Sequence, residues 1–335
     1  MNINLNTPKN IKIAAITAVI FAGVFLVWLN RKTIIEVRGE GGSTSTVGSL
    51  TGQVCPQPTR RPVAVMLASD PVARPLSGVS QADLVIEMPV TPDGVTRMMA
   101  IFQCQTPEEI GSVRSARNDF IPLAAGFGAL LAHWGGEHDA LVRLNEGIIN
   151  NVDAMRYEGT TYYRKPGVKP PHNGFTSLEK LYQVAKERGY NLVDSFGGYS
   201  RGKENKPRNV ASLANNITLP YRAPHNVAWE YDEASKQYKR TRDGQAEMDS
   251  NGKAVAASVV IVLEANIKPA YDQYVSVAVV GTGKAMVYQD GTMHSATWSK
   301  DPASIDSPLL FTRDQNKSVI FMPGTIWIEV VPTME

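Results

Sequence analysis

Cysteine is scarce in this sequence, neither sign of charge dominates, and the common catalytic motifs are missing. Two cysteines in 335 residues exclude a disulfide-rich scaffold, and their spacing does not fit a zinc site. A net charge of only +2 argues against strong nucleic-acid binding, which needs concentrated lysine and arginine. Gly-x-Ser-x-Gly is absent, and the string Gly281-Thr-Gly283-Lys284 lacks the P-loop pattern, so we interpret it as a hairpin turn. We expect no nucleic acid, no metal and no cofactor.

One long apolar run is present, at residues 13–29, in a chain whose composition is otherwise that of a folded protein. This run carries no charge, and as a helix it would cover about 26 Å, enough to cross the hydrocarbon core of a membrane. A cleaved signal peptide and a buried soluble helix are the alternatives, but no small-x-small cleavage site follows the run. We therefore expect a retained transmembrane helix that makes the chain a single-pass membrane protein.

The flanking charges do not decide the orientation of this helix, because Lys9 and Lys12 before it balance Arg31 and Lys32 after it. We expect a cytoplasmic tail at residues 1–12 and extracytoplasmic domains after the helix. An oxidising compartment would allow a Cys55–Cys104 disulfide. The alternative is that Cys55 and Cys104 remain two buried thiols.

In the rest of the chain, the composition and the spacing of apolar residues change along its length. Residues 30–60 are rich in Gly, Ser, Thr and then Pro, which predicts a flexible linker. Residues 61–204 alternate short apolar runs with helical patterns and predict an α/β domain with a mixed sheet. Residues 205–335 hold short β-branched runs separated by Asp-Gly and Asn-Gly turns, and predict a mostly antiparallel β domain. Within the first domain we expect strands at 63–67, 83–88 and 98–103, a strand or helix end at 129–134, and helices at 115–125, 138–147 and 176–188.

The first candidate site group contains Arg114 and Arg117, three residues apart at a predicted strand-to-helix junction. Both guanidinium groups would then face one side near a helix N-terminus, which suits a carboxylate or phosphate ligand. The structural alternative is that the two arginines pair with Glu87 and Asp119 and fix the packing.

The second group surrounds Gly135 and Gly136, with His133 before them and His138 after them. The two histidines are five residues apart across a helix-breaking Gly-Gly pair, so a metal site is not indicated. We expect His133 at a strand end, where it is either a general base or a structural histidine bonded to backbone. The glycines let the backbone turn closely past a ligand or another element.

The third group is the proline-stiffened loop that presents His172 and Asn173 before a helix. A loop with so little freedom is what a pre-organised polar site requires. Alternatively, Asn173 or Thr176 only caps the helix, for which Thr176 and Glu179 form a capping-box pattern.

Several long strings follow one another in the chain and are familiar as a set: RPVAVMLASDPVARPLSGVSQADLVIEMPV, VTRMMAIFQ, IGSVRSARNDF, HWGGEHDA, PHNGFTS, WEYDEASKQYKR and PGTIWIEVVP. From residue 61 to residue 332 the sequence resembles the YerB-like family of bacterial, membrane-attached extracytoplasmic proteins. Members are usually lipoproteins, and their two domains have no known function, although a link to the cell wall is suspected. The resemblance implies an outward-facing chain and a domain boundary near residue 205.

The family pattern matches candidate residues from all three groups, and we expect them to share one polar cleft: Glu87, Arg97, Arg114, Arg117, His133, Gly135, Gly136, His172 and Asn173. This chain departs from the family where a second acidic residue is usual, because it has Thr91-Pro-Asp93-Gly94 instead. The anchoring cysteine of the family is also absent.

Three functions are consistent with these residues. In the first, the cleft binds a cell-envelope ligand such as peptidoglycan or a related polymer. In the second, the protein is a cell-wall hydrolase or transferase in which Glu87 and His133, helped by His172, act as acid and base, while Arg97, Arg114, Arg117, Gly135, Gly136 and Asn173 bind the substrate. In the third, it is a scaffold for cell-wall synthesis enzymes. Because no string matches a known catalytic motif, we favour ligand binding, with the membrane and the cell wall as partners.

Overall fold

The computed structural model describes residues 46–202, 212–271 and 273–333. The predicted tail, the predicted transmembrane helix at residues 13–29 and the linker up to residue 45 lie outside these ranges. Within them, no helix is both long enough and apolar enough to cross a membrane. The chain from Thr46 onward forms one compact unit.

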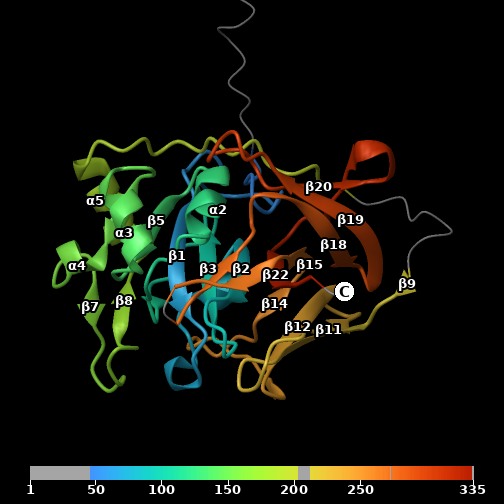
Figure 1. Cartoon of the computed structure of the whole chain (residues 1–335), viewed down its shortest axis with the longest axis horizontal. Coiled ribbons are helices and arrows are strands. Elements are labelled where there is room, and N and C mark those ends of the chain that lie inside the picture. Colours follow the sequence, from blue (N-terminus) through green and yellow to red (C-terminus); the bar gives the residue numbers. More distant parts are fainter. Residues whose placement is uncertain (1–45, 203–211, 272, 334–335) are drawn as a thin grey trace, which may run out of the picture. The chain divides into compact units, whose positions relative to one another are not determined.

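A twelve-stranded sheet runs through both halves of the described chain, and Figure 1 shows it extending from β5 to β20. Its spatial order is β21-β20-β19-β18-β15-β22-β2-β3-β1-β5-β6, and β9 pairs with β19. The last strand of the chain, β22, lies between β15 and β2 and is parallel to both. The first-half strands are β1 (Val63–Ala68), β2 (Leu84–Pro89), β3 (Thr96–Phe102), β5 (Leu130–His133) and β6 (Asn151–Asp153). The second-half strands are β9 (Ser212–Leu213), β15 (Val259–Ala265), β18 (Gly281–Gln289), β19 (Thr292–Lys300), β20 (Leu310–Arg313), β21 (Lys317–Ser318) and β22 (Ile326–Pro332).

The first half adds helices and a small sheet to its mixed strands, as the sequence predicts. The helices α3, α4 and α5 gather near β5, at the end of the central sheet opposite β18 to β20 (Figure 1). The helices are α2 (Phe120–Gly126), α3 (His138–Asn145), α4 (Ala154–Tyr157) and α5 (Leu178–Glu187), with 3-10 turns η1 (Pro71–Ala73) and η2 (Val79–Gln81). The small sheet has the order β4 (Ile110–Gly111), β8 (Gly174–Thr176) and β7 (Tyr163–Arg164).

The second half is mostly antiparallel β structure, which confirms the prediction for this part of the chain. A five-stranded sheet consists of β10 (Asn216–Thr218), β11 (Val227–Asp232), β12 (Gln237–Arg242), β13 (Gln245–Ala246) and β14 (Ala256–Ala257). A two-stranded hairpin consists of β16 (Ile267–Pro269) and β17 (Val275–Val277), and η3 (Asp314–Asn316) follows β20. The predicted Asp-Gly turns are present. Asp243 and Gly244 join β12 to β13, and Asp290 and Gly291 join β18 to β19, all with positive φ.

The central sheet separates two apolar clusters, and strand alternation decides which side chain enters which cluster. In β2, Ile86 and Met88 belong to the first cluster, whereas Val85 belongs to the second. Glu87 therefore projects into the face of the second cluster. In β5, Leu131 belongs to the first cluster, so His133 projects into the face of the first cluster, opposite to Glu87.

Three local predictions were wrong. The predicted helix at 115–125 begins only at Phe120, because residues 112–116 are extended and paired with other segments. Helix α5 is capped by Ser177, whose hydroxyl accepts from Lys180, while Thr176 donates to a backbone carbonyl. The predicted turn at Gly281-Thr-Gly283-Lys284 is the start of β18, where the absence of a side chain at Gly283 leaves room for the Trp298 ring.

Cys55 and Cys104 form a disulfide, with 5.1 Å between their Cα atoms. It joins the segment before β1 to the segment after β3. Of the two states that the sequence leaves open, the structure contains the bridge.

Candidate functional site

Several polar side chains of the first half converge beside the end of β1, and we call the set Asp70, Arg97, Arg114, Arg117 and His172 the arginine cluster. Asp70 follows β1, and Arg97 lies at the start of β3, directly opposite Ala68 of β1. The distance from Arg97 Nη1 to Asp70 Oδ2 is 3.6 Å, and that from His172 Nδ1 to the same oxygen is 4.0 Å. Asp70 therefore lies between side chains from two separate elements.

The backbone of residues 112–116 positions the other two arginines. The Arg114 amide donates to the Met66 carbonyl at 2.8 Å, and the Arg114 carbonyl accepts from the Trp134 amide at 3.0 Å. The segment thus fills the gap between the carboxyl ends of β1 and β5, which are parallel neighbours. Ligands of open α/β sheets commonly bind at this edge of the sheet.

The glycine pair after β5 allows this close packing. Gly135 has φ +60, and its carbonyl accepts from the Ala116 amide at 2.9 Å. A Cβ at Gly136 would lie 3.2 Å from the Ala116 carbonyl oxygen, so a side chain would push the segment away. Of the two roles that the sequence allows, the contacts support a close approach to another element rather than to a ligand.

The polar atoms of the arginine cluster are incompletely paired within the described residues. Arg97 is 3% exposed and His172 is 8% exposed. Among the described residues no hydrogen-bond partner exists for seven buried atoms at this location: Asp70 Oδ2, Arg97 Nε, Arg97 Nη1, Ser112 Oγ, Arg114 Nε, Arg117 Nε and His172 Nδ1. Most buried polar atoms in native proteins do have partners, so each buried group that lacks one needs an explanation, such as a functional role or a bound ion or water.

Electrostatics in the arginine cluster favour an anion. Burial, together with the positive charges of Arg114 and Arg117, lowers the pKa of Arg97 to about 9. Burial also lowers the pKa of Arg114, against the attraction of Asp70. Glu137 lies 3.9 Å from Arg117 Nε, beyond hydrogen-bonding distance. Positive charge therefore exceeds negative charge here, and an anionic group would relieve the mutual repulsion of the arginines.

The second half of the chain contributes one wall of the arginine cluster. The guanidinium of Arg117 lies 4.7 Å from the centre of the Tyr274 ring, which is a cation–π contact. Tyr274 precedes β17, and the Val277 amide of that strand donates to Asp119 at 2.6 Å. The structural alternative from the sequence, in which Asp119 and Glu87 pair with the two arginines, is therefore wrong.

The loop before β8 delivers His172 to the arginine cluster but directs Asn173 elsewhere. Burial lowers the pKa of His172, against the attraction of Asp70. The side-chain oxygen of Asn173 accepts from Arg164 at 3.1 Å, and Arg164 lies 3.9 Å from the Trp134 ring centre. The alternative that Asn173 or Thr176 caps α5 is wrong, since Ser177 does so.

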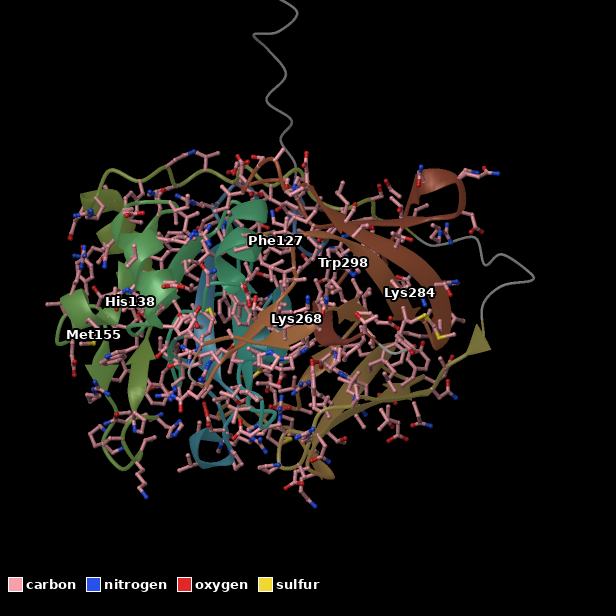
Figure 2. The ribbon with its side chains drawn as sticks, viewed as in Figure 1. Phe127, His138, Met155, Lys268, Lys284 and Trp298 are labelled. Carbon is pink, nitrogen blue, oxygen red and sulfur yellow. A yellow bond between two sulfur atoms is a disulfide. The ribbon has the colours of Figure 1, made fainter. Side chains whose placement is uncertain are left out.

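His133 has a structural environment. It is fully buried, with Nδ1 2.8 Å from the Gly135 carbonyl oxygen and Nε2 3.2 Å from Asn151 Oδ1. Both ring nitrogens therefore have protein partners, which leaves neither nitrogen free to act as a general base. His138 begins α3, as predicted, and Figure 2 shows it on the helical side of the molecule.

Glu87 does not join the arginine cluster, which corrects the prediction of a single cleft. Its carboxylate accepts from Arg242 at 2.6 Å and from Arg240 and Thr96, on the face opposite to that of His133. Two strands, β1 and β3, also separate β2 from β5, so Glu87 and His133 are about 14 Å apart across the sheet. The structure therefore does not bring this acid and this base to one reacting group.

Residues 50–191 match the N-terminal domain, and residues 217–328 the C-terminal domain, of DUF3048, a family described as protein of unknown function. The chain is 32% identical over 282 residues to "Putative lipoprotein YerB" of Bacillus subtilis (strain 168), covering 82% of each chain. The chain belongs to the DUF3048 family. The crystal structure of YerB from Bacillus subtilis has a TM-score of 0.77 and 30% identity, and covers 86% of this chain and 97% of that one. The YerB-like resemblance is thus confirmed.

The two DUF3048 domains of this chain meet at a buried ion network that the sequence did not reveal: Glu87, Arg240, Arg242, Glu247 and Glu329. Although burial alone would raise the pKa of Glu87, Arg242 and Arg240 lower it to about 2. The Trp229 indole also donates to Glu329 at 3.0 Å. No signal in the sequence indicated this network, because Glu87 and Glu329 lie more than 80 residues from Arg240 and Arg242.

Sequence reasoning also missed Asp70 and Ser112 of the DUF3048 N-terminal domain. A signal existed for Asp70, which follows a buried strand by two residues, as binding residues often do. Asp93, which stands near the position of the second acidic residue of the family, is exposed and accepts a hydrogen bond from Thr91. Within the described ranges, no three His, Cys, Asp or Glu side chains form a group that could hold a metal ion.

Proposed function

We propose that this protein is attached to a membrane, lies outside the cytoplasm and binds an anionic group of a cell-envelope polymer at the arginine cluster. The description of its Bacillus subtilis relative as a lipoprotein supports membrane attachment. The apolar run at residues 13–29 would supply the anchor in this chain. A disulfide between Cys55 and Cys104 fits an oxidising compartment.

The observation that carries the binding proposal is the incomplete pairing of three arginines: Arg97 is buried, and Arg114 and Arg117 are half-buried with Nε atoms that lack partners among the described residues. A buried cation without hydrogen-bond acceptors, as Arg97 is among the described residues, is unfavourable by several kcal/mol, and such a residue persists where it has a use. A carboxylate or phosphate oxygen would accept from the unpaired guanidinium nitrogens of two or three arginines at once. Asp70 would in turn accept from a hydroxyl or ammonium group next to that anion.

A hydrolase or transferase built on Glu87 and His133 is not proposed, because these residues occupy opposite faces of the sheet. The remaining candidates of the arginine cluster are cations, one carboxylate and His172. This set is better suited to holding an anion than to proton transfer between two carboxyl groups.

Co-sedimentation of the full chain in detergent with purified peptidoglycan tests this proposal. Peptidoglycan is used in two forms, one that retains its phosphate-containing polymers and one from which hydrofluoric acid has removed them. We expect wild type to pellet with the first form. Retention on the second form would identify carboxylates as the anion, and loss would identify phosphates.

The matched variants are Arg114→Gln with Arg117→Gln, and Arg188→Gln, an exposed arginine after α5. The cluster variant should bind at least about tenfold more weakly, since two charge-assisted hydrogen bonds are lost. The control variant should bind like wild type. Equal pelleting of all three proteins, or no pelleting of wild type, would contradict the proposal.

A further inference from the structure

A pocket of about 260 Å³ lies at the carboxyl ends of three neighbouring parallel strands. Pro89 ends β2, Pro332 ends β22, and Ile267 follows β15 by two residues; all three line the pocket. These strands are adjacent and parallel in the central sheet, in the order β15-β22-β2. Carboxyl ends of parallel strands are where open α/β sheets most often bind ligands. The site needs both halves of the chain, because β2 comes from the first and the other two strands from the second.

The rim of this pocket is positively charged. Arg222 and Lys268 line it, and none of its other lining residues is acidic. Both cationic side chains are exposed, and neither makes an ion pair or side-chain hydrogen bond with a residue that the structure describes. Lys268 lies near the centre of the view in Figure 2, away from the helices of the first half. The remaining walls are mainly prolines, Ile267 and Val275. The pocket therefore fits an uncharged stretch of ligand with an anion at its edge.

The pocket and the arginine cluster are neighbours along one edge of the sheet. Pro89 of the pocket is directly opposite Thr96, and Arg97 is the next residue of β3. On the second-half side, the Tyr274 ring packs on Arg117, while Val275 lines the pocket and its amide donates to the Val90 carbonyl at 3.2 Å. Tyr274 and Val275 are consecutive residues, so one short segment at the start of β17 contacts both sites. Pro89 and Arg97 thus lie on adjacent strands, whose backbones are about 5 Å apart.

We infer that this pocket is a second subsite for the same ligand, and that the ligand is a linear polyanion with at least two charged groups about one repeat apart. This inference rests on the proposed function, since the arginine cluster would hold the first anion. Arg222 and Lys268 then hold the next one, and the apolar walls contact the uncharged linker between them. A single small anion would use the arginine cluster alone.

Titration calorimetry with defined phosphate probes tests this inference on the full chain in detergent. The probes are glycerol phosphate, a single phosphomonoester, and its phosphodiester-linked hexamer, which repeats the phosphate along a chain of glycerol units. If one hexamer molecule occupies both sites at once, it should bind at least about tenfold more tightly than the monomer. The variant is Arg222→Gln with Lys268→Gln. The charge-matched control is Arg188→Gln with Lys253→Gln, which removes two exposed cations elsewhere.

The pocket variant should bind the monomer like wild type and lose about tenfold in affinity for the hexamer. The control variant should bind both the monomer and the hexamer with the affinity of wild type. Equal hexamer affinity of the pocket variant and wild type, with monomer binding intact, would overturn the second subsite and leave the proposed function standing. Failure of wild type to bind either probe would overturn the second subsite for phosphate polymers, and the peptidoglycan assay separately decides the proposed function.

Discussion

The guanidinium of Arg242 donates to the carboxylate of Glu87 at 2.6 Å, and both side chains are buried. The two residues are 155 positions apart, one on β2 of the central sheet and the other on β12 of the five-stranded sheet. Arg240, next but one on β12, bridges Glu87 to Glu329 on β22. The network therefore connects the two halves of the chain and gives Glu87 a structural role.

Substitution of Glu87 by Gln should lower the free energy of unfolding by about 3–5 kcal/mol, because a buried ion pair loses one partner. Urea denaturation followed by tryptophan fluorescence measures this change. The exposed strand residue Glu230 provides the control, since Glu230→Gln should change stability by less than about 0.5 kcal/mol. Unchanged stability of Glu87→Gln would show that the network is not needed for folding.

Glu329 should make the protein less stable as the pH rises from about 4.5 to about 7. Burial, together with the negative charge of Glu87, raises the pKa of Glu329 to about 7 against the attraction of Arg240. An acid whose folded-state pKa is raised binds its proton more tightly when folded, so its stabilisation is complete below about pH 4.5 and is lost as the pH approaches 7.

In Glu329→Gln the neutral form is permanent. Between pH 5 and pH 8 the free energy of unfolding of wild type should fall by about 2–3 kcal/mol relative to that of this variant. Guanidinium denaturation at both pH values gives the difference. Parallel behaviour of the two proteins over this range would mean that Glu329 is charged in the folded state throughout.

Substitution of Arg97 by Met should abolish anion binding without loss of stability. The variant removes a buried cation that two other arginines repel, so the free energy of unfolding should rise by about 1 kcal/mol. Thermal unfolding with and without inorganic phosphate is the measurement, and only wild type should be stabilised by phosphate.

Arg242→Met is the matched comparison for Arg97→Met, because it also removes a buried strand arginine, but a fully paired one. This second variant should be strongly destabilised. Similar destabilisation of the two variants would assign Arg97 a structural role instead.

Loss of the disulfide should lower the free energy of unfolding by about 2–4 kcal/mol, since Cys55 and Cys104 close a loop in the unfolded chain. The double variant Cys55→Ser with Cys104→Ser provides the measurement in denaturant. A reducing agent should shift the unfolding midpoint of wild type toward that of the variant and leave the variant unaffected. A midpoint of wild type that does not respond to the reducing agent would contradict this expectation.

Much of the local structure of this protein could be predicted from sequence. Apolar runs bounded by Pro, Gly and Asp place β1, β2 and β3, and the Asp-Gly pairs place the turns after β12 and β18. These features depend on neighbouring residues, so the sequence contains them directly. The helix at 115–125 was misplaced because the pairing of residues 112–116 with β1 and with the loop after β5 outweighs local propensity.

The sequence by itself determined that Arg97, Arg114, Arg117 and His172 are polar residues at the ends of predicted elements, and the resemblance grouped them. Only the tertiary structure decided which of the grouped residues meet. Because side chains alternate along a strand, Glu87 and His133 lie on opposite faces of the sheet. Which residues of a strand lie on which face depends on how that strand pairs with its neighbours. Charges of distant segments then decided the roles: Arg240 and Arg242 neutralise Glu87, whereas Asp70 and Glu137 lie near the three arginines without hydrogen-bonding to them.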